Sequence, residues 1–279
     1  MTRHALTIDL EDWQQLMTRR LTGRSVPPSD EVLRLTDEIL RFLDRRRVRA
    51  TFFVVGMLAE ARPDLVRGIA AAGHEVATHG YAHLRIDGLT PDAFRSELRR
   101  SVAILGELSG QTVLGHRAPE FSISRANLWA LDILVEEGFA YDSSIFPIRS
   151  RRYGIPDFSR RPCRIATAAG SLVEFPLATL EVASWRVPAA GGGYLRLWPY
   201  AVTHAVLRRH ERDATPAVIY LHPYDLPGER LRLADPAPRW KTWYWMLRHN
   251  IGRTAVMGRL DRLVDEFSFG PLREAVDGV

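Results

Sequence analysis

The chain has 279 residues, of which 46% are hydrophobic and 25% are charged. These proportions are ordinary for a globular protein, and the length suits one large domain such as an α/β barrel. The formal net charge of +5 is spread along the sequence and comes almost entirely from arginine, since Lys241 is the only lysine. Without a block of basic residues, a nucleic-acid partner is not expected.

The single cysteine, Cys163, rules out an internal disulfide and a cysteine-rich metal site. Any bound metal must therefore rest on His, Asp and Glu. The first residues, MTRHALTIDLEDW, lack the basic start and long apolar core of a signal peptide. No apolar stretch approaches the roughly 20 residues needed to span a bilayer. We expect a cytoplasmic protein.

Short runs rich in Val, Ile, Tyr, Phe and Thr predict seven strands. These runs lie near 4–9, 50–56, 74–79, 112–117, 139–143, 171–176 and 217–222. Amphipathic segments with recognisable ends lie between them. They predict helices over 30–46, 63–73, 90–110, 124–138, 199–212 and 254–266. The alternation favours βα units around a parallel sheet or barrel. The stretch 145–170 is expected to be a long surface excursion, and glycines 191–193 a flexible loop.

Polar residues capable of chemistry follow several predicted strands: Asp9, His79, Arg117 and His222. In an α/β barrel the catalytic groups come from the C-terminal ends of the strands, so these four should gather at one mouth. His83 stands four residues after His79, a spacing that lets two imidazoles converge on one point. A catalytic zinc site normally takes three protein ligands, so one more ligand is needed.

The segment TIDLEDW offers three carboxylates, Asp9, Glu11 and Asp12, of which one can bind metal and another can act as a base. If the strand continues past Asp9, Glu11 points to the same side. If the chain turns there, Asp12 can swing in instead. The sequence leaves both possibilities open.

Arg117 suits the role of partner to Asp9, because a nearby guanidinium keeps a carboxylate ionised and oriented. His222 suits a second role as a metal-free histidine that gives a proton to a leaving group. Together these residues predict a metal hydrolase in which the metal lowers the pKa of bound water and polarises a carbonyl.

The ordered set TIDLED, THGYAH, RAPEF, YDSSIFP and YLHPYD resembles the motifs of the NodB-type polysaccharide deacetylases, carbohydrate esterase family 4. The resemblance covers residues 4 to 223. The stretches GGGYLRLWPY and DEFSFGPLRE further resemble the branch encoded with bacterial exopolysaccharide and exosortase loci. The chain 1–279 is thus expected to be one deacetylase-like domain, with a barrel core over 4–223 and a family-specific C-terminal extension over 224–279.

The resemblance implies a distorted (β/α) barrel of about seven strands and a divalent metal, usually zinc, held by one carboxylate and two histidines. By this analogy Asp9 is the base, His79 and His83 are ligands, and Arg117 orients Asp9. His222 is then the acid, Leu221 lines the acetyl pocket, and the backbone N–H of Glu120 helps to hold the oxyanion. The family has two adjacent aspartates, base then ligand, whereas here Leu10 follows Asp9. The ligand is therefore Glu11 or Asp12.

The implied substrate is a bacterial polysaccharide, or its lipid-linked precursor, that carries N-acetyl or O-acetyl groups. Two alternatives keep the fold: an allantoinase-like amidohydrolase acting on a small cyclic amide, and a sugar-binding protein that has lost activity. The second alternative predicts a missing base or acid, and neither Asp9 nor His222 is missing.

The segment 239–253 places Trp240, Trp243, Tyr244, Leu247 and Ile251 on one stripe, with basic residues around it. This pattern is typical of a helix packed on the barrel. The alternative is a helix that lies on a membrane surface, here that of the inner membrane.

Overall fold

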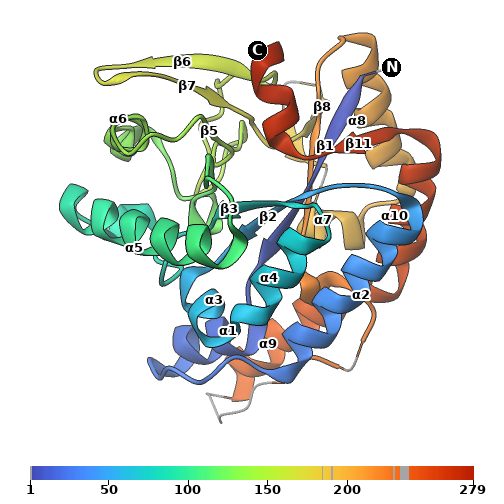
Figure 1. Cartoon of the computed structure of the whole chain (residues 1–279). Helices are drawn as coiled ribbons and strands as arrows, with labels where there is room; N and C mark the ends of the chain where they lie inside the picture. The colour runs from blue at the N-terminus through green and yellow to red at the C-terminus, as the bar shows by residue number, and fades with distance from the viewer. Residues whose placement is uncertain (1, 184, 190, 229, 233–238) are drawn as a thin grey trace.

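The computed structural model of the protein describes residues 2–183, 185–189, 191–228, 230–232 and 239–279 (Figure 1). All seven predicted strands are present and form one parallel series in the order β10-β1-β2-β3-β4-β5-β7. Their bounds are Arg3–Leu10 (β1), Thr51–Val54 (β2), Glu75–Thr78 (β3), Gly115–His116 (β4), Tyr141–Asp142 (β5), Gly170–Glu174 (β7) and Val218–Leu221 (β10). A parallel bridge between Leu177 and Val218 brings the two ends of the series together. The predicted α/β fold is confirmed.

The predicted helices are also found, with small shifts at their ends. The α-helices are α1 (Trp13–Thr22), α2 (Asp30–Arg46), α3 (Gly56–Ala61), α4 (Pro63–Ala71), α5 (Pro91–Ser109), α6 (Trp129–Glu136), α7 (Gly192–Leu197), α8 (Tyr200–Arg212), α9 (Arg239–Asn250) and α10 (Val256–Glu266). Short 3-10 helices span Ile86–Gly88, Pro119–Phe121, Arg125–Asn127, Pro223–Asp225, Arg253–Ala255 and Leu272–Gly278. In the part of the chain that the structure describes, no helix is both long and apolar enough to cross a membrane.

Side chains alternate along the strands between two separate apolar layers. In β1, Leu6 and Ile8 belong to the large core between the strands and the surrounding helices. Ala5, by contrast, belongs to a smaller core enclosed by the strands, together with Phe53 and Tyr220. Odd-numbered residues of β1 therefore face the smaller, inner core. The mouth of the barrel lies at the C-terminal ends of the strands.

The prediction for 145–170 was wrong in part. Ile145, Phe146 and Ile148 are buried, and Cys163–Thr167 forms β6, which pairs antiparallel with β7. The prediction of a flexible loop at glycines 191–193 was also wrong, because α7 begins at Gly192. A Cβ on Gly191 would lie 2.0 Å from Cδ1 of Tyr220, so the glycine permits close backbone approach rather than flexibility.

Three further strands were not predicted. Thr179–Val182 (β8) and Trp185–Pro188 (β9) form a separate antiparallel hairpin. Ser268–Gly270 (β11) pairs in parallel with the first residues of β1, so the C-terminal segment adds a strand to the main sheet.

The close packing of Gly115 in β4 leads to a stability prediction. A Cβ at this position would lie 2.1 Å from Cζ of Tyr141, whose hydroxyl donates to Glu75 Oε1 at 2.9 Å. We expect Gly115→Ala to lower the free energy of unfolding by about 1–3 kcal/mol, measured by denaturant titration. The control is Gly258→Ala in α10, where no atom lies within 4 Å of the new Cβ and helix propensity favours alanine. Equal effects of the two changes would contradict the proposed overpacking.

Candidate functional site

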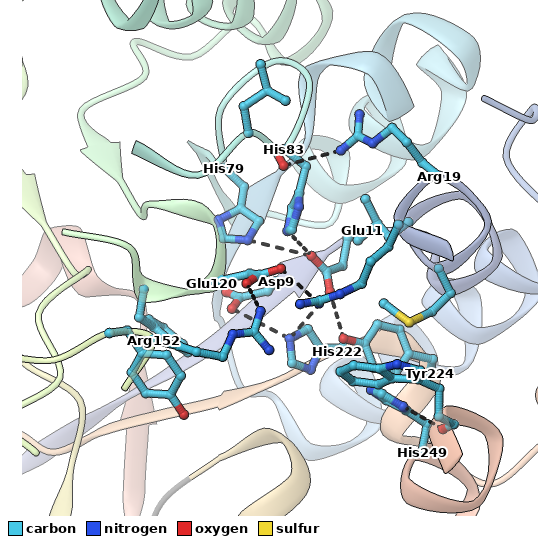
Figure 2. Close-up of a pocket in the computed structure, with 17 residues that line it drawn as sticks. Asp9, Glu11, Arg19, His79, His83, Glu120, Arg152, His222, Tyr224 and His249 are labelled. Carbon is cyan, nitrogen blue, oxygen red and sulfur yellow. Dashed lines mark hydrogen bonds and ion pairs between the residues drawn. The ribbon is translucent and has the colours of Figure 1, made fainter. Parts of the chain in front are cut away.

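Six of the nine predicted site residues line one cavity at the C-terminal ends of β1, β3 and β10 (Figure 2). The cavity has a volume of about 520 Å³, within the range of roughly 300–1,000 Å³ that is common for ligand sites. Its lining includes Asp9, Glu11, His79, His83, Glu120 and His222. Because β1 continues through Leu10, Glu11 falls on the same inward side as Asp9.

Glu11, His79 and His83 form a compact group of possible metal ligands. One ligand atom from each of the three lies within 4.8 Å of the others. His83 Nε2 is 2.6 Å from Glu11 Oε2, and His79 Nε2 is 3.7 Å from the same oxygen. Despite the short contact, Glu11 Oε2 is buried without a hydrogen bond of acceptable geometry within the described residues. A carboxylate oxygen and two ring nitrogens that point at one place fit a divalent cation.

The histidine tautomer and the local charges agree with this fit. His79 Nδ1 lies 2.8 Å from the carbonyl oxygen of Arg117, a contact that makes Nδ1 the donor and leaves the Nε2 lone pair for a ligand. Burial lowers the pKa of His79 to about 4, so its imidazole is neutral at pH 7. Burial opposes ionisation of Glu11, but His83 and the other nearby histidines hold the pKa of this carboxyl below its usual range. The group therefore presents an anionic carboxylate from Glu11 and a neutral imidazole from His79.

Asp9 is held by a buried arginine. Arg117, which is fully buried, donates from Nη1 to Asp9 Oδ1 at 2.6 Å and to Thr7 Oγ1 at 2.8 Å. The second oxygen of Asp9, Oδ2, lies 3.9 Å from His222 Nε2. The expected pairing of Arg117 with Asp9 is present, and it leaves one carboxylate oxygen free to face the cavity.

His222 is oriented by Asp225. Its Nδ1 lies 2.8 Å from Asp225 Oδ2, and Asp225 Oδ1 lies 2.8 Å from Nε of Arg196. Burial opposes charge on the imidazole, but Asp225, together with Glu11 and Asp9, raises the pKa of His222 to about 9. The ring therefore carries a proton near neutral pH, and its Nε2 faces the carboxylates of the cavity.

Two predicted site residues lie elsewhere. Asp12 caps α1: its Oδ1 accepts from the Gln15 N–H at 2.9 Å, and its Oδ2 accepts from the N–H and hydroxyl of Ser29 at 2.6 Å. Both of its oxygens are thus engaged, so it does not fit the ligand role. Leu221 is 1% exposed and belongs to the outer core, because alternation in β10 turns Tyr220 and His222 inward. Leu221 therefore does not line the cavity, and its role at the acetyl pocket stays a prediction.

Glu120 does line the cavity, and its backbone is unusual. Glu120 and Phe121 both have positive φ angles, 54° and 53°, although neither is glycine. Such a conformation costs roughly 1–3 kcal/mol per residue and is concentrated at functional sites. The geometry is compatible with the oxyanion role that the family resemblance implies.

Sequence reasoning missed Tyr224 and Asp225, both in the quoted segment YLHPYD. The Tyr224 hydroxyl donates to Glu11 Oε1 at 2.7 Å, and its ring stacks on His222 with centroids 4.6 Å apart. The signal for Asp225 was the spacing of three residues from His222, which closes a capping box around Pro223–Asp225. Both residues support groups that were predicted, rather than adding a new reactive group.

The chain matches known protein families in two adjacent regions of its sequence. Residues 29–134 match the family described as polysaccharide deacetylase. Residues 143–277 match a family described as a domain of unknown function (DUF3473). A peptidoglycan-N-acetylglucosamine deacetylase of Bacillus cereus is 34% identical over 101 residues, which are 36% of this chain and 37% of that protein. A chitooligosaccharide deacetylase of Rhizobium leguminosarum is 34% identical over 99 residues, 36% of this chain and 43% of that protein. These matches span less than half of either relative.

Solved structures agree on the fold. A Mycobacterium smegmatis protein assigned as a polysaccharide deacetylase has a TM-score of 0.67 at 23% identity, covering 99% of this chain and 89% of that one. An allantoinase, Puue, has a TM-score of 0.62 at 15% identity, covering 95% of this chain and 83% of that one. At such identities the likeness concerns the fold alone. Residues 29–134 thus match the polysaccharide deacetylase family in sequence, and the chain shares the α/β fold of the solved structures.

Proposed function

We propose that this protein is a metal-dependent hydrolase that removes N-acetyl groups from a bacterial polysaccharide. The observation that carries the proposal is the placement of Glu11, His79 and His83 within 4.8 Å of one another, beside the carboxylate of Asp9. Three ligands on one side of a cation leave a position open for water or substrate. A divalent metal held there, which we propose to be zinc, would polarise the acetyl carbonyl and make water more acidic.

Each remaining residue then has a proposed part. Asp9 Oδ2, the oxygen that Arg117 leaves free, takes the proton of the attacking water. The Glu120 N–H donates a hydrogen bond to the oxygen on which negative charge develops. His222 is protonated near neutral pH because of Asp225, so its Nε2 can give a proton to the departing amine.

Several findings support the deacetylase over the two alternatives. The allantoinase likeness is one of fold only, whereas the match over residues 29–134 is to deacetylases in sequence. An inactive sugar-binding protein would not need a buried Asp9 ion-paired to Arg117 or a His222 charged by Asp225. The relatives named for peptidoglycan and chitooligosaccharide substrates support an N-acetylated glycan.

We extend the proposal to the biological setting. The resemblance of residues 191–200 and 265–274 to the exosortase-locus branch supports a role in exopolysaccharide synthesis, on the polymer or on its lipid-linked precursor. We also propose that core and C-terminal extension act as one domain, which the pairing of β11 with β1 supports. The cytoplasmic location stays a prediction from the sequence.

Helix α9 supports a peripheral contact with an anionic membrane surface. Its inner face lines the cavity through Trp245 and His249. Its outer face exposes 70% of Trp240, 66% of Trp243, 48% of Tyr244 and 37% of Leu247. Ile251, which follows the helix, is 46% exposed. Residues 239–253 contain no acidic residue, and Arg248 is exposed. The side chains of Arg239 and Lys241 lie outside the described part. Exposed Trp and Tyr beside positive charge are typical of a membrane-surface helix.

The choice of carboxylate ligand can be tested by metal content. We expect Glu11→Gln to lose the bound metal, because it removes the anionic ligand. Asp12→Ala should keep the metal and instead lower the free energy of unfolding by about 0.5–2 kcal/mol, because the N-cap of α1 is lost. Elemental analysis and denaturant titration of both variants measure these effects. Loss of metal in Asp12→Ala with retention in Glu11→Gln would contradict the ligand set.

The division of roles can be tested by acetate release from an N-acetylated chito-oligosaccharide. Asp9→Asn should retain metal and lose turnover. His222→Ala should also retain metal and slow turnover by about 10²–10⁴-fold, as is typical when a general acid is removed. His79→Ala should lose both metal and activity. If Asp9→Asn loses metal while Glu11→Gln keeps it, base and ligand are reversed. Hydrolysis of allantoin without release of acetate would favour the cyclic-amide alternative.

The membrane contact can be tested by sedimentation with vesicles. The protein should bind vesicles that contain phosphatidylglycerol better than vesicles of phosphatidylcholine alone. The double change Trp240→Ser with Trp243→Ser should lower binding at least several-fold. Trp185→Ser is the matched control, since Trp185 is 64% exposed but lies in β9. Equal loss in the control, or no binding by the unchanged protein, would refute a contact through α9.

A further inference from the structure

Arginine side chains from three parts of the chain converge on Glu120 at the cavity. Arg20 from α1 donates to Glu120 Oε1 at 3.1 Å. Arg85, which follows β3, donates to Glu120 Oε2 at 3.0 Å, and Arg152 from the segment after β5 also pairs with Oε2. Three guanidinium groups thus share one carboxylate, which is more positive charge than a structural ion pair needs.

The surrounding carboxylates do not balance this charge. Arg85 has a second partner, Asp87, at 2.7 Å. Arg20 and Arg152 have no carboxylate other than Glu120 within 4.0 Å among the described residues. Burial lowers the pKa of Arg20, and repulsion from Arg152 and Arg85 lowers it further, whereas Glu120 raises it.

A fourth arginine, Arg19, adds to the excess. Its Nη2 donates to the carbonyl oxygen of His83 at 3.3 Å, and no carboxylate of the described residues lies within ion-pair distance of it. The side chain is half-buried at the cavity wall, where burial lowers its pKa although Glu97 opposes this. The excess positive charge therefore lies at two places: beside Glu120, through Arg20 and Arg152, and beside His83, through Arg19.

Three of these four arginines share the cavity with the candidate metal ligands. Arg19, Arg20 and Arg152 line the same 520 Å³ space as Glu11 and His79. Figure 2 shows Arg152 with Glu120 on one side of these ligands and Arg19 beside His83 on the other. The side chains of Arg20 and Arg152 are 34% and 42% exposed, so a ligand in the cavity can reach them.

We propose that the arginine cluster on Glu120, formed by Arg20, Arg85 and Arg152, binds an anionic group of the substrate through Arg20 and Arg152, which line the cavity, while the acetamide lies at the metal site. The inference rests on the proposed function and narrows the substrate to an acidic glycan. A guanidinium presents paired donors that match a carboxylate or a phosphate. The anion is accordingly the carboxylate of a uronic acid or the phosphate of a phosphorylated or lipid-diphosphate-linked sugar.

The test compares N-acetylated oligosaccharides of equal length that are neutral, carry a uronic acid, or carry a reducing-end diphosphate. Arg152→Gln should lower kcat/KM for at least one acidic substrate by about 10-fold to 100-fold, mainly through KM, because a charged hydrogen bond is lost. That loss should exceed the loss on the neutral substrate by about tenfold. Which acidic substrate is affected identifies the anion. Equal losses on all three would overturn the proposal.

Arg151→Gln is the matched control, because it makes the same charge change one residue away at an exposed position that does not line the cavity. It should leave every kcat/KM unchanged. Arg20→Gln, which changes α1 instead, should show the same selective loss of kcat/KM on the acidic substrate. Agreement between the two variants would exclude a folding defect in Arg152→Gln as the cause.

A binding measurement separates this proposal from the deacetylase activity. Calorimetric titration of the metal-loaded protein with glucuronic acid and with inorganic phosphate should show binding of at least one anion, weakened about tenfold or more in Arg152→Gln and unchanged in Arg151→Gln. Absence of binding by both anions, or equal binding by both variants, would overturn the anion site. Absence of acetate release from every substrate would instead overturn the proposed function.

Discussion

The buried guanidinium of Arg117 is the interaction on which the site depends. It joins β1 to the strand ends of β4 and β5 by donating to Thr7, Asp9 and Ser143, and its own carbonyl fixes the tautomer of His79. A charge with no exposed surface is stable only when it is fully paired, and removal of one partner commonly costs about 3–5 kcal/mol. One residue thus couples the stability of the barrel to the orientation of both the proposed base and a proposed ligand.

The neighbours of the other reactive side chains explain how these side chains divide their roles. Asp9 and Glu11 stand two residues apart on the inward side of β1, yet their surroundings differ. Asp9 is paired with a permanent cation, whereas Glu11 meets His83 and the hydroxyl of Tyr224. His222 is oriented by Asp225, and its Nε2 lies 3.6 Å from Glu11 Oε1. Asp9, Glu11 and His222 are therefore suited to different tasks by their neighbours.

Much of this arrangement could be predicted from the sequence because its signals are local. The seven strand runs and the polar residues that follow them placed Asp9, His79, Arg117 and His222 at one mouth. The carboxylate ligand could not be chosen, because the choice depends on whether β1 ends at Asp9 or at Leu10. The side of β10 on which Leu221 lies could not be predicted either, because it depends on which residues of this strand face inward in the folded sheet. The arginine cluster was not foreseen, since its members come from distant segments that meet only on Glu120.

The most direct test of the central claim is an anomalous X-ray diffraction measurement at the zinc edge on crystals of the zinc-loaded protein. The account predicts one strong peak bonded to a Glu11 carboxylate oxygen and to Nε2 of both His79 and His83, at about 2.0–2.2 Å. In the electron density of the same crystals, Asp9 should remain paired with Arg117 and outside bonding distance of the metal. A peak bonded to Asp9 or Asp12 in place of Glu11, or no peak at these histidines, would contradict the account.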